Sequence, residues 1–390
     1  MSQLKAQRND SIAPFYVMEL MRRSRELEKS GRSIIHMEVG EPDFPTPTPV
    51  VKAAQRFLES EIVHYTSAIG LPQLRGAIAK FYQTRYGVLL DPQQIAITSG
   101  GSSALTLLLS VLTNPDSEWL MVDPGYPCNR HIIRAFGGRD VALNVDASTR
   151  FQPTLQQIKE KWTSKTAGLI LVSPSNPTGT VLTKQEIEGF AEYVKEKNGA
   201  LIIDEVYHGL TYEEPAATAA GLNSNTFVVQ SFSKYFNMTG WRVGWIVAPE
   251  GYSTLLEKMA QNLFIAPPTV GQHAALTALL PETIEILERR KLEFKARRDY
   301  LYSELIDIGF KIEGKPSGAF YIWADCRPFG RDSFKLASEF LENCGVAVTP
   351  GLDFGSNFPE RHLRFAYTTG LEQLREGMRR IREYLSTAVP

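Results

Sequence analysis

The sequence predicts an α/β protein with a large domain, built on a mostly parallel mixed sheet with helices on both faces, and a smaller α+β domain formed by both chain ends. Between residues 95 and 247, short continuous apolar segments alternate with segments of helical period, which is the pattern of a parallel sheet covered on both sides. This alternation stops near residue 281. Because 390 residues suffice for two domains, we expect the large one at 50–285 and the small one at 1–49 and 286–390.

The individual elements are predicted from hydrophobic period and from turn residues. Amphipathic helices are expected at 11–30, 50–60, 73–86, 104–112, 186–197, 282–308, 334–342 and 371–385. Continuous β-branched and aliphatic runs predict the strands of the large sheet at 95–98, 119–122, 168–172, 201–203, 227–229 and 243–247. Further strands are expected at 34–40, 320–323 and 362–366.

The charge balance excludes several classes of partner. Lysine and arginine total 42 against 43 acidic residues, so no general field draws the chain to nucleic acid or to an anionic membrane. No apolar run approaches the roughly 20 residues of a membrane helix, and the N-terminal segment lacks the apolar core of a secretory signal. Cys128, Cys326 and Cys344 are few and far apart, which indicates reduced thiols in a cytoplasmic protein rather than disulfides or a metal site.

The stretch 231–244 carries the strongest indication of chemistry. Lys234 follows a buried apolar strand, and desolvation there would make its amine a usable nucleophile for Schiff-base formation. Ser231, Ser233 and Arg242 would supply hydrogen-bond donors to a phosphate. A reactive amine beside a phosphate site indicates pyridoxal phosphate, and the alternative is an ordinary lysine with two turn serines at a strand end.

Other candidate residues lie where predicted strands end, which is where open α/β sheets bind ligands. Gly101 and Ser102 begin a helix whose amides would bind an anion, although the same residues suit an ordinary helix cap. Tyr126, on a turn between two prolines, would stack on a heteroaromatic ring or simply pack in its loop. Asn176 is also held between prolines and would donate to a phenolate oxygen or bond its own backbone.

Two charged residues on buried strands need partners. Asp204 directly follows an apolar strand, and a protonated pyridine nitrogen would both pair with it and act as an electron sink, with Tyr207 in reach of the same ring. A metal is the alternative, but no ligand set of suitable spacing is present, and Glu205 and His208 need only be solvated. Arg364 lies amid apolar residues and would bind a substrate carboxylate or an internal acid.

Four motifs follow one another in a specific order: Asn-Pro-Thr-Gly at 176–179, Asp-Glu-Val-Tyr at 204–207, Ser-Phe-Ser-Lys at 231–234 and Gly-Trp-Arg-Val-Gly at 240–244. This series resembles the fold-type I pyridoxal-phosphate-dependent aminotransferases of class I/II, the group that includes aspartate, alanine and aromatic amino acid transaminases. The resemblance extends from about residue 40 to about residue 370, so the large domain is expected to bind the cofactor.

The resemblance implies a role for each matching residue. On the cofactor ring, Lys234 would form an internal aldimine, Asp204 would pair with the ring nitrogen, Asn176 and Tyr207 would bond the phenolic oxygen, and Tyr126 would stack. The phosphate would be bound by Gly101, Ser102, Ser231, Ser233 and Arg242. Tyr65 would reach the phosphate of the neighbouring subunit, which implies a homodimer with shared active sites. The substrate would meet Arg364 at its α-carboxylate, with Asn176 beside it and Gly40 in the loop that closes over it.

The implied activity is transfer of an amino group from an L-amino acid to a 2-oxo acid, with 2-oxoglutarate as the expected acceptor and ping-pong kinetics. A lyase or synthase that uses the same cofactor on the same scaffold is the nearest alternative. A non-catalytic module of a transcription regulator is more distant, because no basic helix-turn-helix segment is found before the predicted fold. A nicotinamide-binding enzyme would require G-x-G-x-x-G after the first strand, which this sequence lacks.

One departure from the family pattern concerns the substrate side chain. Aspartate transaminases supply a second arginine from the partner subunit, within a segment that corresponds to 258–289. Between Lys258 and Arg289 this chain has no lysine or arginine, and residues 264–268 are apolar. With Ile12 and Phe15 folded over the site, the pocket would favour apolar or aromatic side chains, although relatives also recognise dicarboxylates by other means.

Overall fold

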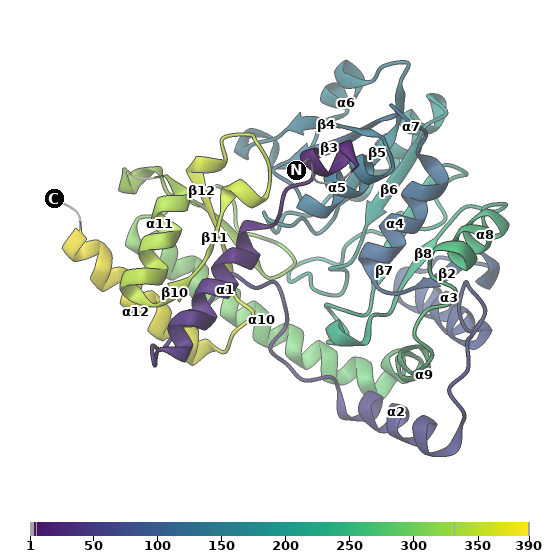
Figure 1. The fold of residues 1–390 in the computed structure, drawn as a ribbon, viewed down its shortest axis with the longest axis horizontal. Coiled ribbons are helices and arrows are strands. Elements are labelled where there is room, and N and C mark those ends of the chain that lie inside the picture. Colours follow the sequence, from purple (N-terminus) through teal and green to yellow (C-terminus); the bar gives the residue numbers. More distant parts are fainter. Residues whose placement is uncertain (1–3, 5, 331, 389–390) are drawn as a thin grey trace.

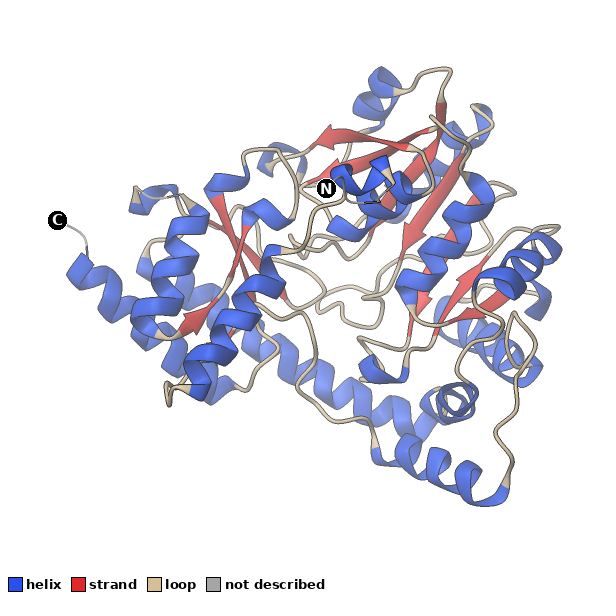
Figure 2. Ribbon diagram, viewed as in Figure 1, coloured by secondary structure: helices blue, strands red, loops and turns tan. Residues whose placement is uncertain are grey.

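A computed structural model describes residues 4, 6–330 and 332–388. A seven-stranded sheet forms the centre of the larger part of the molecule. Its strands are β2 (Ile95–Thr98), β3 (Glu118–Asp123), β4 (Arg139–Asn144), β5 (Thr166–Val172), β6 (Ala200–Asp204), β7 (Thr226–Ser231) and β8 (Gly244–Val247). They lie in the order β2-β8-β7-β6-β5-β3-β4 (Figure 2). β8 runs opposite to the other six strands, which are parallel to one another, so the mixed and mostly parallel sheet is confirmed.

Helices cover both faces of this sheet because its strands are apolar on both sides (Figure 1). One face packs on α4 (Gly101–Leu112), α5 (Pro127–Ala135) and α8 (Ser253–Leu263). The other face packs on α3 (Pro72–Tyr86), α6 (Leu155–Lys161), α7 (Lys184–Glu196) and α9 (Thr269–Ala278), with α2 (Thr48–Ser60) against α9. The side chains of one strand alternate between the two cores: in β6, Ile202 points to the first, and Leu201 and Ile203 to the second.

The strand β4 was not predicted from the sequence. It lies at the edge of the sheet, where it pairs with β3 only, and Leu143 is its one buried residue. An edge strand needs few apolar side chains, so the continuous apolar run that identified the other strands is missing here.

A smaller part of the molecule joins the two ends of the chain. The antiparallel strands β9 (Tyr321–Asp325), β12 (His362–Ala366) and β11 (Thr349–Pro350) form one sheet, and β1 (Ile35–His36) pairs in parallel with β10 (Val346–Ala347). The helices of this part are α1 (Tyr16–Lys29), α11 (Ser333–Glu339) and α12 (Leu371–Ala388). The long helix α10 (Pro281–Ile308) runs from α9 to this part (Figure 1). The expected small domain includes residues 1–3, 5, 331 and 389–390, which lie outside the described residues.

The N-terminal elements are shorter than predicted. The expected strand at 34–40 is reduced to β1, and the chain stays extended without ladder pairing beyond it. The expected helix at 11–30 begins only at Tyr16, because Pro14 disfavours helical backbone just before it; a 3-10 turn occupies Gln7–Ser11. Asp353 caps α1, since its carboxylate accepts hydrogen bonds from the backbone amides of Tyr16 (2.6 Å) and Val17 (2.8 Å).

The described residues lack two further kinds of binding element. In the part of the chain that the structure describes, no helix combines the length and the apolar character needed to cross a bilayer. The same residues contain no group of three or more His, Cys, Asp or Glu side chains arranged to hold a metal ion.

Candidate active site

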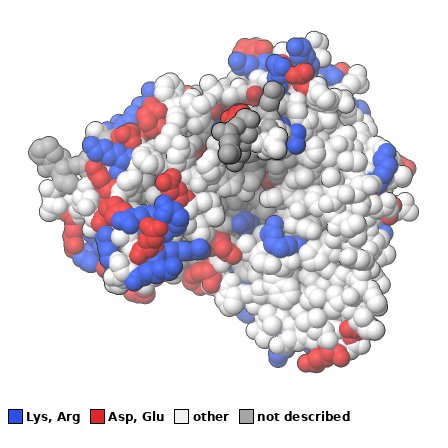
Figure 3. Space-filling model, viewed as in Figure 1, with Lys and Arg blue, Asp and Glu red and all other residues white. Residues whose placement is uncertain are grey.

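A cavity of about 350 Å³ lies where the carboxyl ends of β5, β6 and β7 face α1, β9 and β12. In the space-filling view it opens as a hollow near the middle of the molecule (Figure 3). All but one of the predicted site residues line it: Gly40, Gly101, Ser102, Tyr126, Asn176, Asp204, Tyr207, Ser231, Ser233, Lys234, Arg242 and Arg364. The exception is Tyr65, which lies in the loop between α2 and α3 and is 84% exposed.

Lys234 follows β7, and its Nζ donates a hydrogen bond to the carbonyl of Gly40 (2.7 Å). Burial lowers the pKa of this amine to about 8; the nearby charges of Arg364 and Arg242 lower it further, whereas Glu41 and Asp204 oppose the shift. A substantial fraction of the amine is therefore neutral near physiological pH, as a nucleophile or a general base requires.

Asp204 is the last residue of β6 and is 5% exposed. Its carboxylate accepts a hydrogen bond from the backbone amide of Val206 (3.1 Å), and burial raises its pKa to about 7, although that bond and Lys234 lower it. No cationic side chain of the described residues forms an ion pair with it. A buried carboxylate without a cationic partner is suited to a positively charged group that enters the cavity.

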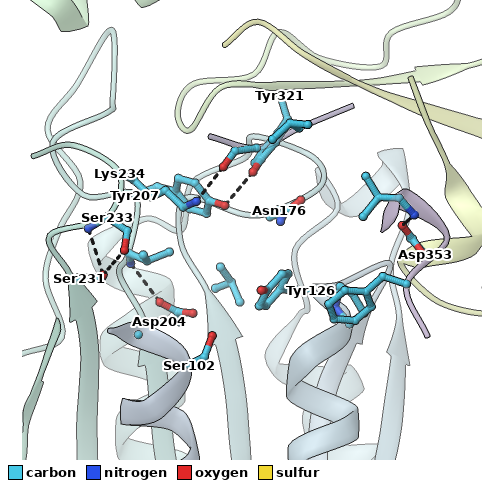
Figure 4. Close-up of a pocket in the computed structure, with 18 of the residues that line it drawn as sticks. Ser102, Tyr126, Asn176, Asp204, Tyr207, Ser231, Ser233, Lys234, Tyr321 and Asp353 are labelled. Carbon is cyan, nitrogen blue, oxygen red and sulfur yellow. Dashed lines mark hydrogen bonds between the residues drawn. The ribbon is translucent and has the colours of Figure 1, made fainter. Parts of the chain in front are cut away.

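The hydroxyl groups of Tyr207 and Tyr321 meet inside the cavity with their oxygens 2.9 Å apart (Figure 4). Burial raises the pKa of both phenols, so each keeps its proton. Gly40 packs against the same pair, because a Cβ atom at this position would lie 1.9 Å from the Tyr321 hydroxyl oxygen. The absence of a side chain at Gly40 thus makes room for Tyr321.

Arg364 on β12 is 5% exposed and points its guanidinium into the same region. Nη1 donates to the Asn176 side-chain oxygen (3.0 Å), and Nη2 donates to the Glu38 carbonyl (2.5 Å). Its Nε is buried without a hydrogen-bond partner, and among the described residues Arg364 forms no ion pair. The internal acid considered as an alternative partner is therefore not found, and the buried cation is suited to an anionic ligand.

A second anion site lies at the other end of the cavity. Helix α4 begins at Gly101, so its first amides are unpaired within the helix and face an approaching anion. Ser231 Oγ donates to Ser233 Oγ (2.9 Å), and Ser102 lies beside them at the helix start (Figure 4). Arg242 Nη1 donates to the Thr239 carbonyl (3.0 Å), a contact that holds the guanidinium at the same end of the cavity.

These groups fit pyridoxal phosphate. The lysine of lowered pKa, the unpaired buried carboxylate and the helix-terminal anion site match the aldehyde, the pyridine nitrogen and the phosphate of this cofactor. Tyr126 lies on the cavity wall between Ser102 and the Asp353 side (Figure 4). Its ring is uncharged because burial raises the pKa of the hydroxyl, and a neutral ring is suited to stacking.

The prediction that Glu205 and His208 are solvated is wrong. Both are buried behind the cavity, where Glu205 accepts hydrogen bonds from the Ala219 amide (2.7 Å) and from Thr218 Oγ1 (2.8 Å). Burial raises the pKa of Glu205 to about 8 and lowers that of His208 to about 3. Sequence reasoning missed this because no local pattern predicts that the loop at 216–220 folds back over Glu205.

Several cavity-lining residues were not predicted as site residues. They come from the smaller part of the molecule and from the start of α1: Val17, Met18, Met21, Glu38, Tyr321, Asp353 and Phe354. The strand around Tyr321 was predicted from the sequence. Its position beside the loop of Gly40 was not predicted.

Comparison with known proteins identifies the family. The family model described as aminotransferase class I and II matches residues 32–381. The valine–pyruvate aminotransferase of Mycobacterium tuberculosis is 34% identical over 96% of this chain and 97% of its own length. The (5-formylfuran-3-yl)methyl phosphate transaminase of Methanocaldococcus jannaschii is 34% identical over 95% and 97%, respectively. A crystal structure of an aminotransferase from M. tuberculosis, 33% identical, superposes with a TM-score of 0.95 over 99% of this chain and 100% of that chain. The chain therefore belongs to the class I and II aminotransferases, a family of enzymes that use pyridoxal phosphate.

Proposed function

We propose that the aminotransferase reaction takes place in the Lys234 cavity, by transfer of an amino group from an L-amino acid to a 2-oxo acid in two half-reactions. The observation that carries this proposal is that Lys234, Asp204 and Arg364 line one cavity although they come from different strands and loops. The two relatives named above differ in the substrates that their names give, so family membership leaves the donor and the acceptor open.

The chain would hold the cofactor at its aldehyde, ring and phosphate. Lys234 would bond it covalently, Asp204 would keep its ring nitrogen protonated, and Asn176 and Tyr207 would donate to its phenolic oxygen while Tyr126 stacks on the ring. The phosphate is bound by Gly101, Ser102, Ser231, Ser233 and Arg242. When bound, pyridoxal phosphate supplies an electron sink for the electron pair left at the substrate Cα after loss of its proton.

Arg364 would bind the substrate α-carboxylate and so orient the Cα–H bond toward Lys234. Lys234 would act as the general base that takes the Cα proton and later returns it. Its lowered pKa is suited to both directions of this transfer. In its resting position the amine is held by the Gly40 carbonyl, in the loop that we expect to close over the substrate.

A homodimer with shared active sites is supported by the exposed loop that carries Tyr65. Around this loop, apolar side chains are exposed on α2, α8 and the segments after them: Leu58, Ile62, Val63, Tyr65, Leu255, Leu263 and Ile265. The surface over α2, α4 and α8 shows few charged side chains (Figure 3). We propose that a second copy covers this face and receives Tyr65 at its phosphate site.

Two further proposals concern organisation and location. Residues 50–285 would act as the large, cofactor-binding domain, and 1–49 with 286–390 as the small domain, with the cavity between them. A cytoplasmic location is supported by Cys128, Cys326 and Cys344, since no disulfide joins these thiols.

The test uses the purified holoenzyme with single amino acids in the absence of an acceptor. An aminotransferase converts the lysine-bound cofactor to its aminated form and releases one 2-oxo acid per site, and a 2-oxo acid then restores the original spectrum. Release of ammonia over many turnovers without an acceptor would instead identify a lyase and contradict the proposal.

A further inference from the structure

We propose that the donor and the acceptor are monocarboxylic and carry apolar side chains, in place of the 2-oxoglutarate expected from the sequence. This inference rests on the proposed function of the Lys234 cavity. It follows from the charges that line the cavity and from the side chains that face Arg364 across it.

Each described cation of the cavity wall is already assigned to a group other than the substrate side chain. They are Lys234, Arg242 and Arg364, which are assigned to the covalent bond, the phosphate and the substrate α-carboxylate. Two more arginines lie on α5, but neither lines the cavity. Arg130 donates to the Phe354 carbonyl (2.8 Å), and Arg134 forms an ion pair with Asp140 (2.6 Å). A second substrate carboxylate would thus enter the cavity without a counter-charge from this chain.

The acidic residues of the cavity cannot balance the charge of a second substrate carboxylate. Glu38 is fully buried, and its Oε1 pairs with His36 Nδ1 (2.7 Å), whose pKa it raises to about 9, so the imidazolium balances its charge. Asp353 accepts hydrogen bonds from the first amides of α1. Neither carboxylate offers a positive charge to a second anion, and an ionised Asp353 repels one; discrimination of this kind needs no attractive contact to the correct substrate.

The remaining wall is apolar. The first two turns of α1 and the residue before it contribute Phe15, Val17, Met18 and Met21, and the Phe354 ring lies 4.9 Å from the Arg364 guanidinium. The cap from Asp353 fixes the start of α1, so these side chains hold their place over the cavity. A substrate side chain that leads away from Arg364 toward α1 would meet carbon and sulfur atoms.

A second subunit would add no basic side chain if it contributes the segments proposed for the dimer. The loop segment 57–74, which carries Tyr65, contains no lysine or arginine, and neither does the segment between Lys258 and Arg289. The shortage of cations therefore applies to both subunits of the expected dimer.

The experiment measures kcat/KM of the holoenzyme for leucine, methionine and phenylalanine against aspartate and glutamate as donors, and for the matching 2-oxo acids as acceptors. We expect the apolar substrates to exceed the dicarboxylic ones by at least about 100-fold, the range that single hydrophobic pockets achieve. Calorimetry with 4-methylpentanoate and succinate, which cannot react, should show binding of the first only. Preference for a dicarboxylic donor or acceptor would overturn this inference alone, whereas failure of all donors would overturn the proposed function as well.

A gain-of-function variant tests the missing charge directly. Met18 is at the mouth of the cavity and 57% exposed, so M18R should be tolerated. We expect M18R to raise kcat/KM for glutamate by about 10-fold, the effect of a good charge-assisted contact, and to lower it for leucine. The matched M18Q variant, similar in length but uncharged, should not raise glutamate turnover. An unchanged cofactor spectrum in both variants shows that the site is intact, and equal glutamate rates in M18R and M18Q would contradict the inference.

Discussion

The hydroxyl oxygen of Tyr321 lies 2.9 Å from that of Tyr207, and this contact joins the smaller sheet to the end of the large one. Tyr207 is proposed to donate its proton to the phenolic oxygen of the cofactor, so its own oxygen is the acceptor for Tyr321. The second hydroxyl then strengthens the first as a donor, because hydrogen bonds in a chain polarise one another. Tyr321 acts through Tyr207 and is a positioning residue.

For Y321F we expect the pKa of the lysine-bound cofactor, measured by absorbance against pH, to rise by about half a pH unit to one pH unit. The loss of one hydrogen bond is worth about 0.5–1.5 kcal/mol, and one pKa unit corresponds to about 1.4 kcal/mol. The matched control is Y212F, since Tyr212 is a half-buried tyrosine of this region whose hydroxyl donates to the Ala319 carbonyl outside the cavity. Equal titration curves for the two variants and the wild type would count against the role of Tyr321.

Replacement of Asp204 by asparagine should remove the charge that keeps the cofactor nitrogen protonated while preserving the shape of the side chain. We expect kcat to fall by about 10²–10³-fold, the usual cost of removing one preorganised charge-stabilising group, and the affinity for the cofactor to fall as well. D116N is a suitable control, because Asp116 forms an exposed ion pair with Arg139 away from the cavity. A D204N enzyme with kcat within a few-fold of the wild type would refute the assignment.

The residues predicted for the large sheet converge because parallel strands end at the same edge. Val172, Asp204 and Ser231 are the last residues of β5, β6 and β7, so the polar residues that follow them in the sequence had to lie close together. Local sequence was sufficient for this half of the site, and Asn176, Asp204, Ser231 and Lys234 all line the cavity.

The other half of the site depends on contacts between distant segments. Glu38 and Asp353 line the cavity only because β1 pairs with β10 and because the start of α1 is capped by a residue 337 positions away. Such pairings leave no local period or turn signal in the sequence. Arg364 was found because a cation within an apolar strand is conspicuous by itself, whereas Tyr321 resembled any core aromatic of a strand.

The lowered pKa of Lys234 predicts how the apoenzyme captures its cofactor. Only the neutral amine attacks the aldehyde, so the rate of covalent attachment should rise with pH around a midpoint near 8 and level off above about pH 9. Stopped-flow absorbance measures this rate, and borohydride reduction followed by peptide mass analysis shows that Lys234 is the residue modified. A midpoint near the ordinary lysine value of about 10.5 would show that burial does not activate this amine.

The buried carboxyl of Glu205 makes the stability of the fold depend on pH in a direction opposite to that of most acidic residues. Burial raises its pKa to about 8 in the folded protein, against an ordinary value of 4.5 in the unfolded chain. Between these two values the folded protein holds a proton that the unfolded chain releases, so this residue lowers stability as the pH rises from about 4.5 to about 8. Glutamine resembles the protonated form and has no proton to lose. We therefore expect E205Q to match the wild-type melting temperature near pH 5 and to exceed it by several degrees near pH 8.5.

Scanning calorimetry of both proteins across this range, with E188Q as a control on the exposed side of α7, isolates the effect of burial. Glu188 is half-exposed in an ion pair with Lys184 on that helix, so its replacement should leave the pH profile of the melting temperature unchanged. Parallel profiles for E205Q and the wild type would mean that Glu205 is ionised in the fold, held by the Ala219 amide, the Thr218 hydroxyl and His208 Nδ1 (3.2 Å). In that case the charge behind Asp204 would be present above about pH 4.5, and the proton of Asp204 would be harder to remove throughout that range.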